Sequence, residues 1–274
     1  MNVSGRWSAM LALVLGLALV PLSARADAIA HWSFDEVSGT AVGDSVRPSS
    51  PGTVRNPLTA DQNLNTSDSV FGGSSLFLSN GSDYVGVPRL EMSRTSFTIA
   101  AWVNPAAIDN GDEIFGDWSS PWQFRLWLNS NGSVSATLRK DGPAAHNGDL
   151  LMLGTAGGLV GLDEWTHVAM TWDRGTKTGR LYIDGVQRAS STITAIDLNL
   201  KDGNHAEYQI GWKRDDGGGK FYGLMDELWV FDYALSADEI NLLQTSNEIP
   251  EPASLSLLAM AAAGLGGYVR RRRG

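Results

Sequence analysis

The sequence contains no cysteine among its 274 residues. This absence excludes disulfide bonds, thiolate catalysis and zinc sites built on cysteine. Four histidines are scattered without the H-x-x-x-H spacing of a helical zinc site, which argues against a zinc centre. Positive charge is also scarce, because residues 29–248 hold 15 basic and 28 acidic residues, a net charge of −13. Nucleic-acid binding needs a cationic face, so a nucleic-acid ligand is disfavoured.

Helical periodicity is almost absent between residues 29 and 235, where short alternating runs are separated by turn residues. In "SFTIAAWVN", for example, Phe97, Ile99, Ala101 and Val103 alternate with Thr98, Ala100 and Trp102. The pattern predicts an all-β sandwich or barrel, in which two curved sheets could bury the residues at alternate positions between them. One helix is expected at the end of this region, with Ser236 as N-cap and Glu239 as its capping-box partner.

Both termini carry apolar runs. Near the N-terminus, Arg6 precedes an apolar run over residues 10–20, and two overlapping A-x-A sites follow at residues 24–28. This layout predicts a secretory signal peptide over residues 1–28. Near the C-terminus, residues 253–269 predict a transmembrane helix of about 25 Å at 1.5 Å per residue. The arginines at 270–273 would stay on the cytoplasmic side, which leaves the β-rich body outside.

The C-terminal features follow a recognisable order. Pro250, Glu251 and Pro252 precede the apolar segment, and the arginine cluster follows it. The whole segment, residues 247–274, resembles the PEP-CTERM sorting tail of Gram-negative bacteria. The resemblance implies processing by an exosortase, a membrane transpeptidase-like enzyme. It also implies delivery to the cell surface or to the extracellular polysaccharide matrix.

The body carries a second resemblance, over residues 29–246. The segments "HWSFDEVSGTAVGDS", "SFTIAAWVNP", "EWTHVAMTWDRGTKTGRLYIDGV" and "FYGLMDELWVFDYALSADEI" occur in the order of LamG-like jelly-roll domains. Those domains belong to the concanavalin A-like lectin/glucanase superfamily. The resemblance implies a two-sheet jelly roll with adjacent first and last strands. It also implies a structural Ca²⁺ near that junction, at the matching acidic residues Asp35, Asp44 and Asp226. The alternative is that Asp35 and Asp44 organise turns and that Asp226 is a satisfied acid at the end of a strand.

Glycanases of this superfamily need two closely placed carboxylates. Their E-x-D-x-x-E signature is absent, and Glu113 and Asp117 in "DEIFGD" lack the intervening acid. Adjacent Asp226 and Glu227 would face opposite sides of a regular strand. We therefore expect a protein without catalytic activity, although an enzyme that uses scattered loop residues is the remaining alternative.

Tryptophans in loop-like stretches indicate where a ligand would bind. Trp118 and Trp122 flank a Ser-Ser-Pro turn, and Trp212 precedes a glycine-rich loop. An exposed indole ring stacks on the apolar face of a sugar. The sequence therefore predicts a carbohydrate-binding module at the surface or in the matrix. The alternatives are tryptophans that only cap the edge of the sandwich, and a structural or protein-binding matrix component without a sugar site.

Overall fold

The computed structural model describes residues 28–36, 39–55, 64–65, 68–79, 83–92, 95–117, 124–139, 150–193, 207–212 and 218–248. All of them lie in one compact unit that spans residues 26–250. Apart from Ala28, the last residue of the predicted signal peptide, the signal peptide, transmembrane helix, sorting motif and arginine cluster lie outside the described residues. Within the described part of the chain, no helix combines the length and hydropathy that a membrane crossing requires.

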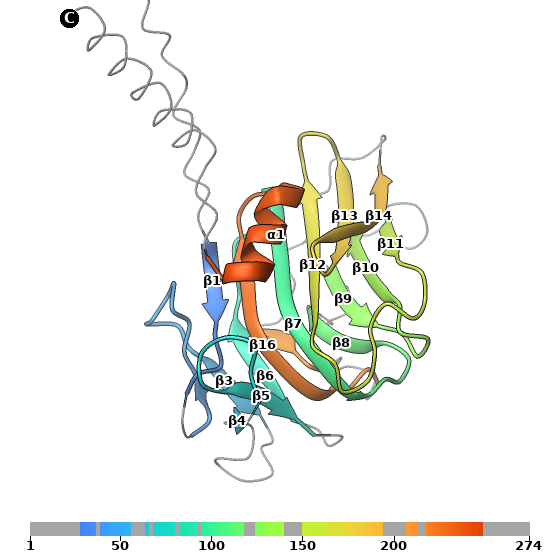
Figure 1. Cartoon of the computed structure of the whole chain (residues 1–274). Coiled ribbons are helices and arrows are strands. Elements are labelled where there is room, and N and C mark those ends of the chain that lie inside the picture. Colours follow the sequence, from blue (N-terminus) through green and yellow to red (C-terminus); the bar gives the residue numbers. More distant parts are fainter. Residues whose placement is uncertain are drawn as a thin grey trace, which may run out of the picture. The chain divides into compact units, whose positions relative to one another are not determined.

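The described residues form two antiparallel sheets and one helix (Figure 1). The first sheet has the order β14-β13-β12-β7-β16-β5-β4, with β1 also paired to β16, and the second has the order β11-β10-β9-β8-β15-β6-β3-β2. The strands of the first sheet are β1 (Ala28–Trp32), β4 (Leu64–Asn65), β5 (Ser75–Leu78), β7 (Phe97–Ala107), β12 (Thr166–Asp173), β13 (Thr178–Ile183), β14 (Val186–Thr192) and β16 (Tyr222–Phe231). Those of the second are β2 (Ala41–Val42), β3 (Gly52–Arg55), β6 (Tyr84–Pro88), β8 (Asp112–Gly116), β9 (Phe124–Leu128), β10 (Val134–Arg139), β11 (Leu150–Gly154) and β15 (Glu207–Ile210).

The main core lies between the two sheets. Alternate residues of β7, namely Phe97, Ile99, Ala101 and Val103, are fully buried, as the alternating pattern predicts. Aromatic rings from opposite sheets meet there, with 6.4 Å between the ring centroids of Phe97 and Phe124. The prediction of an all-β, two-sheet antiparallel sandwich is confirmed.

The helix α1 (Ala237–Ser246) covers the outer face of the first sheet. The expected capping box is present, because the Glu239 amide donates to Ser236 Oγ and the Ser236 amide donates to the Glu239 carboxylate. Ile240 and Leu243 are buried in a second apolar cluster that includes Trp229 of β16. One outer face of the sandwich is therefore occupied by the protein itself.

The first and last strands are adjacent, as the resemblance implies. β16 pairs with β5 through residues 223–225 and with β1 through residues 228–231. Between these two stretches of β16, its register against the neighbouring strand β7 shifts, and Glu227 adopts a positive φ of 51°. This bulge lets Met225 and Leu228 both enter the core although they are three residues apart. The expectation of a regular strand at Asp226 and Glu227 is therefore wrong.

Candidate functional site

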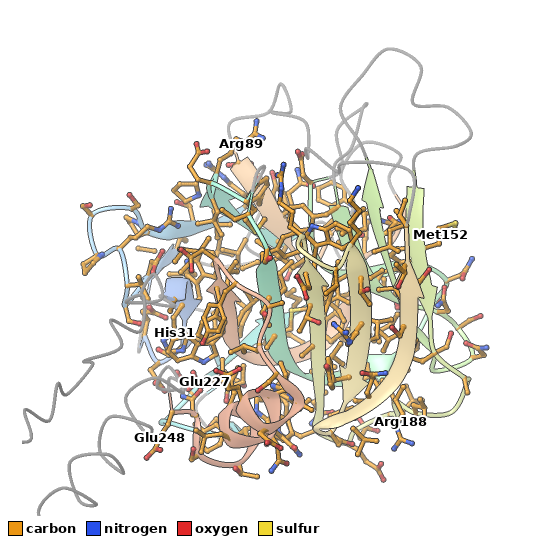
Figure 2. The ribbon with its side chains drawn as sticks, turned by 90° about the horizontal axis from the view of Figure 1, so that it is seen from above. His31, Arg89, Met152, Arg188, Glu227 and Glu248 are labelled. Carbon is orange, nitrogen blue, oxygen red and sulfur yellow. The ribbon has the colours of Figure 1, made fainter. Side chains whose placement is uncertain are left out.

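A polar row crosses the outer face of the second sheet. Strand pairing aligns Gln209, Gly116, Arg125 and Thr137 side by side on β15, β8, β9 and β10. The neighbours of these residues along each strand belong to the core, so the row points away from it. Met152 on β11 ends the row and is 61% exposed (labelled in Figure 2). We call these five residues the outer row.

Arg125 is the charged centre of the outer row. Its guanidinium forms an ion pair with Glu113, at 2.7 Å from Nη2 to Oε2, and donates to the Gly111 carbonyl oxygen at 3.2 Å. It also lies over the Trp127 ring, 4.5 Å from the centroid. A Cβ at Gly116 would overlap the Glu113 carboxylate, so the glycine leaves the space in which this acid lies. The arrangement fixes a planar cation beside an aromatic ring.

A second acid lies over a second glycine on the other side of Gln209. Gly86 of β6 pairs with Gln209, and a Cβ at Gly86 would overlap the Glu207 carboxylate. Glu207 is held by Arg55, with 2.9 Å between Arg55 Nη2 and Oε2, and the Tyr84 hydroxyl donates to it at 3.4 Å. Carboxylates therefore flank the Gln209 amide on both sides.

Several polar atoms around the outer row are buried and have no hydrogen-bond partner. They are Gln209 Oε1, Thr137 Oγ1 and Trp212 Nε1. Each unsatisfied buried group costs about 1–3 kcal/mol of folding free energy. Such groups in a native fold call for an explanation, and unmet hydrogen bonds to a ligand are one. The three atoms offer two acceptors and two donors, because a hydroxyl both accepts and donates.

Trp212 is the predicted ligand-binding residue that the structure describes. It is half-buried, its ring meets Tyr84 edge to face at 5.2 Å between centroids, and the Lys220 ammonium lies 5.7 Å from its centroid. Tyr84 links this ring to the acid at Glu207. Trp118 and Trp122 lie outside the described residues.

The predicted metal ligands are distributed over two places. Asp44 is 1% exposed and accepts hydrogen bonds from the backbone amides of His31, Val46 and Arg47. Its second oxygen accepts from Arg47 Nε at 2.9 Å. Asp44 therefore organises its own turn, the alternative considered for it from the sequence.

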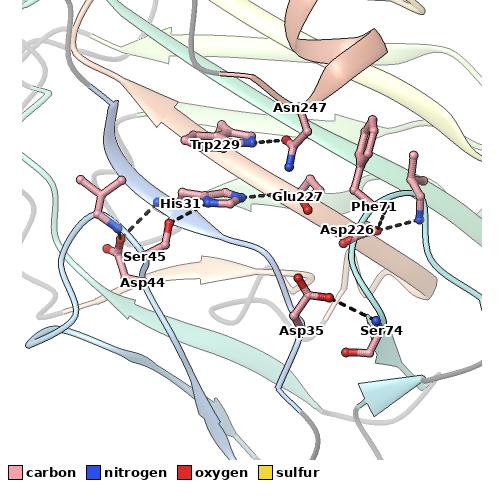
Figure 3. A network of polar contacts seen from close by, with 12 residues as sticks. His31, Asp35, Asp44, Ser45, Phe71, Ser74, Asp226, Glu227, Trp229 and Asn247 are labelled. Carbon is pink, nitrogen blue, oxygen red and sulfur yellow. Dashed lines mark hydrogen bonds and ion pairs between the residues drawn. The ribbon is translucent and has the colours of Figure 1, made fainter.

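Asp226 and Asp35 lie near each other at the bulge (Figure 3). Asp226 is fully buried, and its Oδ2 accepts from the amides of Val70 and Phe71, while Oδ1 has no partner. Burial, together with the charges of Glu227 and Asp35, raises the pKa of Asp226 to about 7, although the hydrogen bonds from the Val70 and Phe71 amides act to lower it. An orphaned buried carboxylate oxygen beside a second carboxylate fits a hard cation such as Ca²⁺.

Asp35 itself is exposed and accepts from the amides of Gly73 and Ser74, at 2.7 and 3.2 Å. Among the described residues, no group of three or more His, Cys, Asp or Glu side chains is placed to hold a metal ion. A cation held by Asp226 and Asp35 would therefore need further oxygens from the backbone or from water.

Sequence reasoning missed a polar network centred on His31 (Figure 3). His31 Nε2 lies 2.5 Å from Glu227 Oε2, and Nδ1 lies 2.7 Å from Ser45 Oγ. The imidazole stacks on Trp229 with 3.5 Å between centroids, and Trp229 Nε1 donates to Asn247 Oδ1 at 2.8 Å. Residues 196 positions apart meet here, so no local spacing signals the contact.

The His31 network joins the first strand, the last strand and the end of α1. Its Ser-His-Glu composition resembles a hydrolase triad, but acyl transfer also needs free donors for an oxyanion. Around Ser45, the amides of Ser45, Val46 and Arg47 already donate to His31 O and Asp44 Oδ1. The network is therefore best explained as a structural contact that holds the first strand, the last strand and the end of α1 together.

Comparisons with known proteins agree with this architecture. A family profile described as the concanavalin A-like lectin/glucanases superfamily matches residues 79–241, and a PEP-CTERM protein-sorting motif matches residues 248–273. A search of curated protein sequences gave no match.

Among solved structures, the chain is similar to domain 4 of AbnA, an extracellular arabinanase from Geobacillus stearothermophilus, in complex with arabinotriose. The TM-score is 0.56 at 21% identity, over 81% of this chain and 100% of that one. The binding domain of Paraclostridial Mosquitocidal Protein 1 gives 0.58 at 14% identity, over 78% of this chain and 53% of that one. The receptor-binding domain of botulinum neurotoxin type G gives 0.53 at 15% identity, over 80% and 51%. The chain thus spans about half of each toxin domain, and these similarities concern the fold.

Proposed function

Because the chain belongs to the concanavalin A-like lectin/glucanases superfamily, we propose that its folded domain binds a carbohydrate without cleaving it. The PEP-CTERM motif indicates an exported protein that is sorted to the cell surface. We further propose that an exosortase processes the tail near residues 250–252, after transient anchoring by residues 253–269. The ligand is then a glycan of the surface or of the extracellular matrix.

The observation that carries this proposal is the unsatisfied polarity of the outer row. Gln209 and Thr137 are each 3% exposed, and each has a polar atom without a partner. Sugar hydroxyls donate and accept hydrogen bonds, so a glycan admitted to this face would match both atoms. The row crosses five strands, at about 4.8 Å per strand, and is therefore long enough for several sugar units.

Aromatic rings beside the row support the same ligand class. Trp127 and Trp212 are half-buried and lie near Arg125 and Tyr84 respectively. Tryptophan offers a sugar an apolar surface and one N–H donor, and the Nε1 of Trp212 is still without an acceptor. In the described structures of similar fold, the arabinanase domain was solved with a bound trisaccharide.

The proposed absence of catalysis is supported by the state of the nearby acids. Nε and Nη2 of Arg125 both lie close to Glu113 Oε2, at 2.8 and 2.7 Å, so this acid is already engaged in an ion pair. Burial does raise the pKa of Asp112 to about 6, the change expected of a general acid. Its Oδ2, however, accepts the Asp109 amide at 2.6 Å within its own turn. Release of reducing sugar or unsaturated product from a polysaccharide panel would overturn this part of the proposal.

We also propose a structural Ca²⁺ held by Asp226 and Asp35. The proposal is limited to these two because Asp44 is already saturated by its own turn. The cation would neutralise Asp226 Oδ1 and fasten the loop at residues 70–74 to the bulge of β16. Calcium would supply charge compensation for the fold and no chemistry on the ligand.

The central experiment separates binding from folding at Gln209. Gln209→Leu keeps about the same side-chain volume and removes Oε1, the buried oxygen without a partner, so the free energy of unfolding should stay the same or rise. Binding to the best glycan of an array, measured with the exported full chain, should fall at least tenfold. Trp212→Ala should also weaken binding, and Trp118→Ala with Trp122→Ala tests the other predicted pair.

Trp165→Ala is the matched control. Trp165 is half-buried and hydrogen-bonded to Asp68, and it precedes β12 of the first sheet. Its removal should leave glycan affinity unchanged. Unchanged glycan affinity in both Gln209→Leu and Trp212→Ala would refute the outer row as the site. Capture of a surface protein, with no glycan bound by the unaltered chain, would favour the protein-interaction alternative instead.

A further inference from the structure

A separate pocket of about 610 Å³ opens at the start of β1. Its volume is within the range of about 300–1,000 Å³ that is typical of small-molecule sites. The lining combines apolar side chains, among them Ile29, Val46 and Leu90, with the four charged residues Arg47, Arg89, Glu91 and Asp232. None of these residues belongs to the outer row, so the pocket is separate from it.

Arg47 is held in place at the pocket wall. Its Nε donates to Asp44 Oδ2 at 2.9 Å and its Nη1 donates to the Arg89 carbonyl oxygen at 3.4 Å. The third nitrogen, Nη2, is shielded from water and has no partner. Nη2 is therefore the nitrogen of this guanidinium that the fold leaves unused, on a residue that lines the pocket. A pre-oriented guanidinium loses little entropy on binding.

Arg89 adds a second cation to the same pocket. Its guanidinium carbon lies 5.5 Å from the centroid of the Tyr208 ring, which is almost fully buried. The two arginines stand out on a domain whose net charge is −13. Guanidinium groups match the planar, two-oxygen geometry of a carboxylate.

The acids of the pocket narrow the ligand class. Glu91 and Asp232 also line it, so a doubly charged phosphate would meet repulsion that a singly charged carboxylate meets less. Their oxygens are also suitable acceptors for hydroxyl groups. Ile29, Val46 and Leu90 offer an apolar wall for the carbon face of a ring. Carboxylate, hydroxyls and an apolar ring face occur together in acidic sugars, and the uronic acids are those built into acidic polysaccharides.

We propose that this pocket binds a uronic acid unit of an acidic polysaccharide. The proposal relies on the glycan-binding function for the sugar and on Arg47 and Arg89 for the charge. The outer row then contacts neutral hydroxyls, while the pocket selects acidic chains. Ala28 is the last residue of the predicted signal peptide and Ile29 follows it, so the measurement uses the chain with its leader removed, in which Ile29 and the remaining lining residues are kept.

The test compares each of three uronans, alginate, galacturonan and glucuronan, with its methyl ester, which keeps the sugar and removes the charge. The exported chain should bind the free acid of at least one of them at least tenfold more tightly than the ester. Arg47→Gln and Arg89→Gln should each bring this ratio close to one. Arg188→Gln is the matched control, because Arg188 is exposed on β14 and lies far from Arg89 in Figure 2.

The possible outcomes distinguish the two proposals. Arg47→Gln can disturb the Asp44 turn, so the melting temperature of each variant is measured, and Arg89→Gln carries the test if Arg47→Gln unfolds. Equal affinity for acid and ester in all three pairs, or no binding to any uronan, overturns the uronate pocket. If a neutral glycan still binds and Gln209→Leu abolishes that binding, the proposed function stands without the pocket. If the ratio of acid to ester affinity is unchanged in both Arg47→Gln and Arg89→Gln, the uronate pocket is overturned as well.

Discussion

Replacing Asp226 by asparagine tests the electrostatics of the strand junction. The folded chain raises the pKa of this buried carboxyl from 3.8 to about 7. A raised pKa means that the protonated form is favoured in the fold, so its contribution to stability is complete below pH 3.8 and is lost as the pH rises through 7. At 1.36 kcal/mol per pKa unit, the ionised group costs about 4 kcal/mol above pH 7.

Asparagine keeps the shape and carries no charge. Its carbonyl oxygen can still accept the amides of Val70 and Phe71, which now donate to Asp226 Oδ2. In the presence of EGTA, we therefore expect Asp226→Asn to be more stable than the unaltered chain by up to about 4 kcal/mol at pH 8. At pH 4 the difference should nearly vanish. Urea unfolding followed by tryptophan fluorescence measures both values.

Added Ca²⁺ should reverse the order of stability of the unaltered chain and Asp226→Asn. The unaltered chain should gain stability on addition of Ca²⁺, whereas Asp226→Asn should gain little, because its amide cannot neutralise the cation. A variant that is less stable than the parent at pH 8 in EGTA would refute the electrostatic reasoning. If the electrostatic result holds but Ca²⁺ leaves both melting temperatures unchanged, only the calcium proposal is overturned.

Three further predictions concern the fold. Complete burial lowers the pKa of His167 to about 3, so the fold favours the neutral ring. Its contribution to the free energy of unfolding is complete above pH 6.5, and up to about 5 kcal/mol is lost as the pH falls towards 3. His167→Gln should therefore show a shallower acid transition by circular dichroism. Gly116→Ala should cost about 1–3 kcal/mol in urea unfolding because its Cβ would displace Glu113, whereas Gly73→Ala, with open space around it, should cost much less. Ser236→Ala should cost about 1 kcal/mol and lower the melting temperature, since it removes the cap of α1; an unchanged value would show that the helix is held by packing alone.

Local pattern was sufficient for the strands and the helix. The alternation in β7 predicted its buried face, because successive side chains of a strand point to opposite sides. The Ser236–Glu239 spacing predicted the start of α1, since a capping box is built within four residues. The pairing of β9 with β10 likewise follows from the short turn at residues 129–132.

The bulge of β16 could not be predicted in this way. Asp226 and Glu227 stand in an ordinary apolar run, and nothing nearby signals a positive φ. The bulge forms where β5 and β1 succeed each other as partners, which depends on strands more than 140 residues away along the chain. For the same reason, the pair of His31 with Glu227 was missed.

The sequence alone determined which classes of function the composition disfavours, the strand pattern, the capped helix and the family, because each depends on residue types or on spacing within a few residues. Tertiary structure alone decided which polar groups meet. Gln209, Arg125 and Thr137 form one row because three separate strand registers happen to align them. Asp226 and Asp35 become neighbours because the first and last strands pair side by side. Register and burial are properties of the whole packed chain, and they set both the positions and the charge states of these groups.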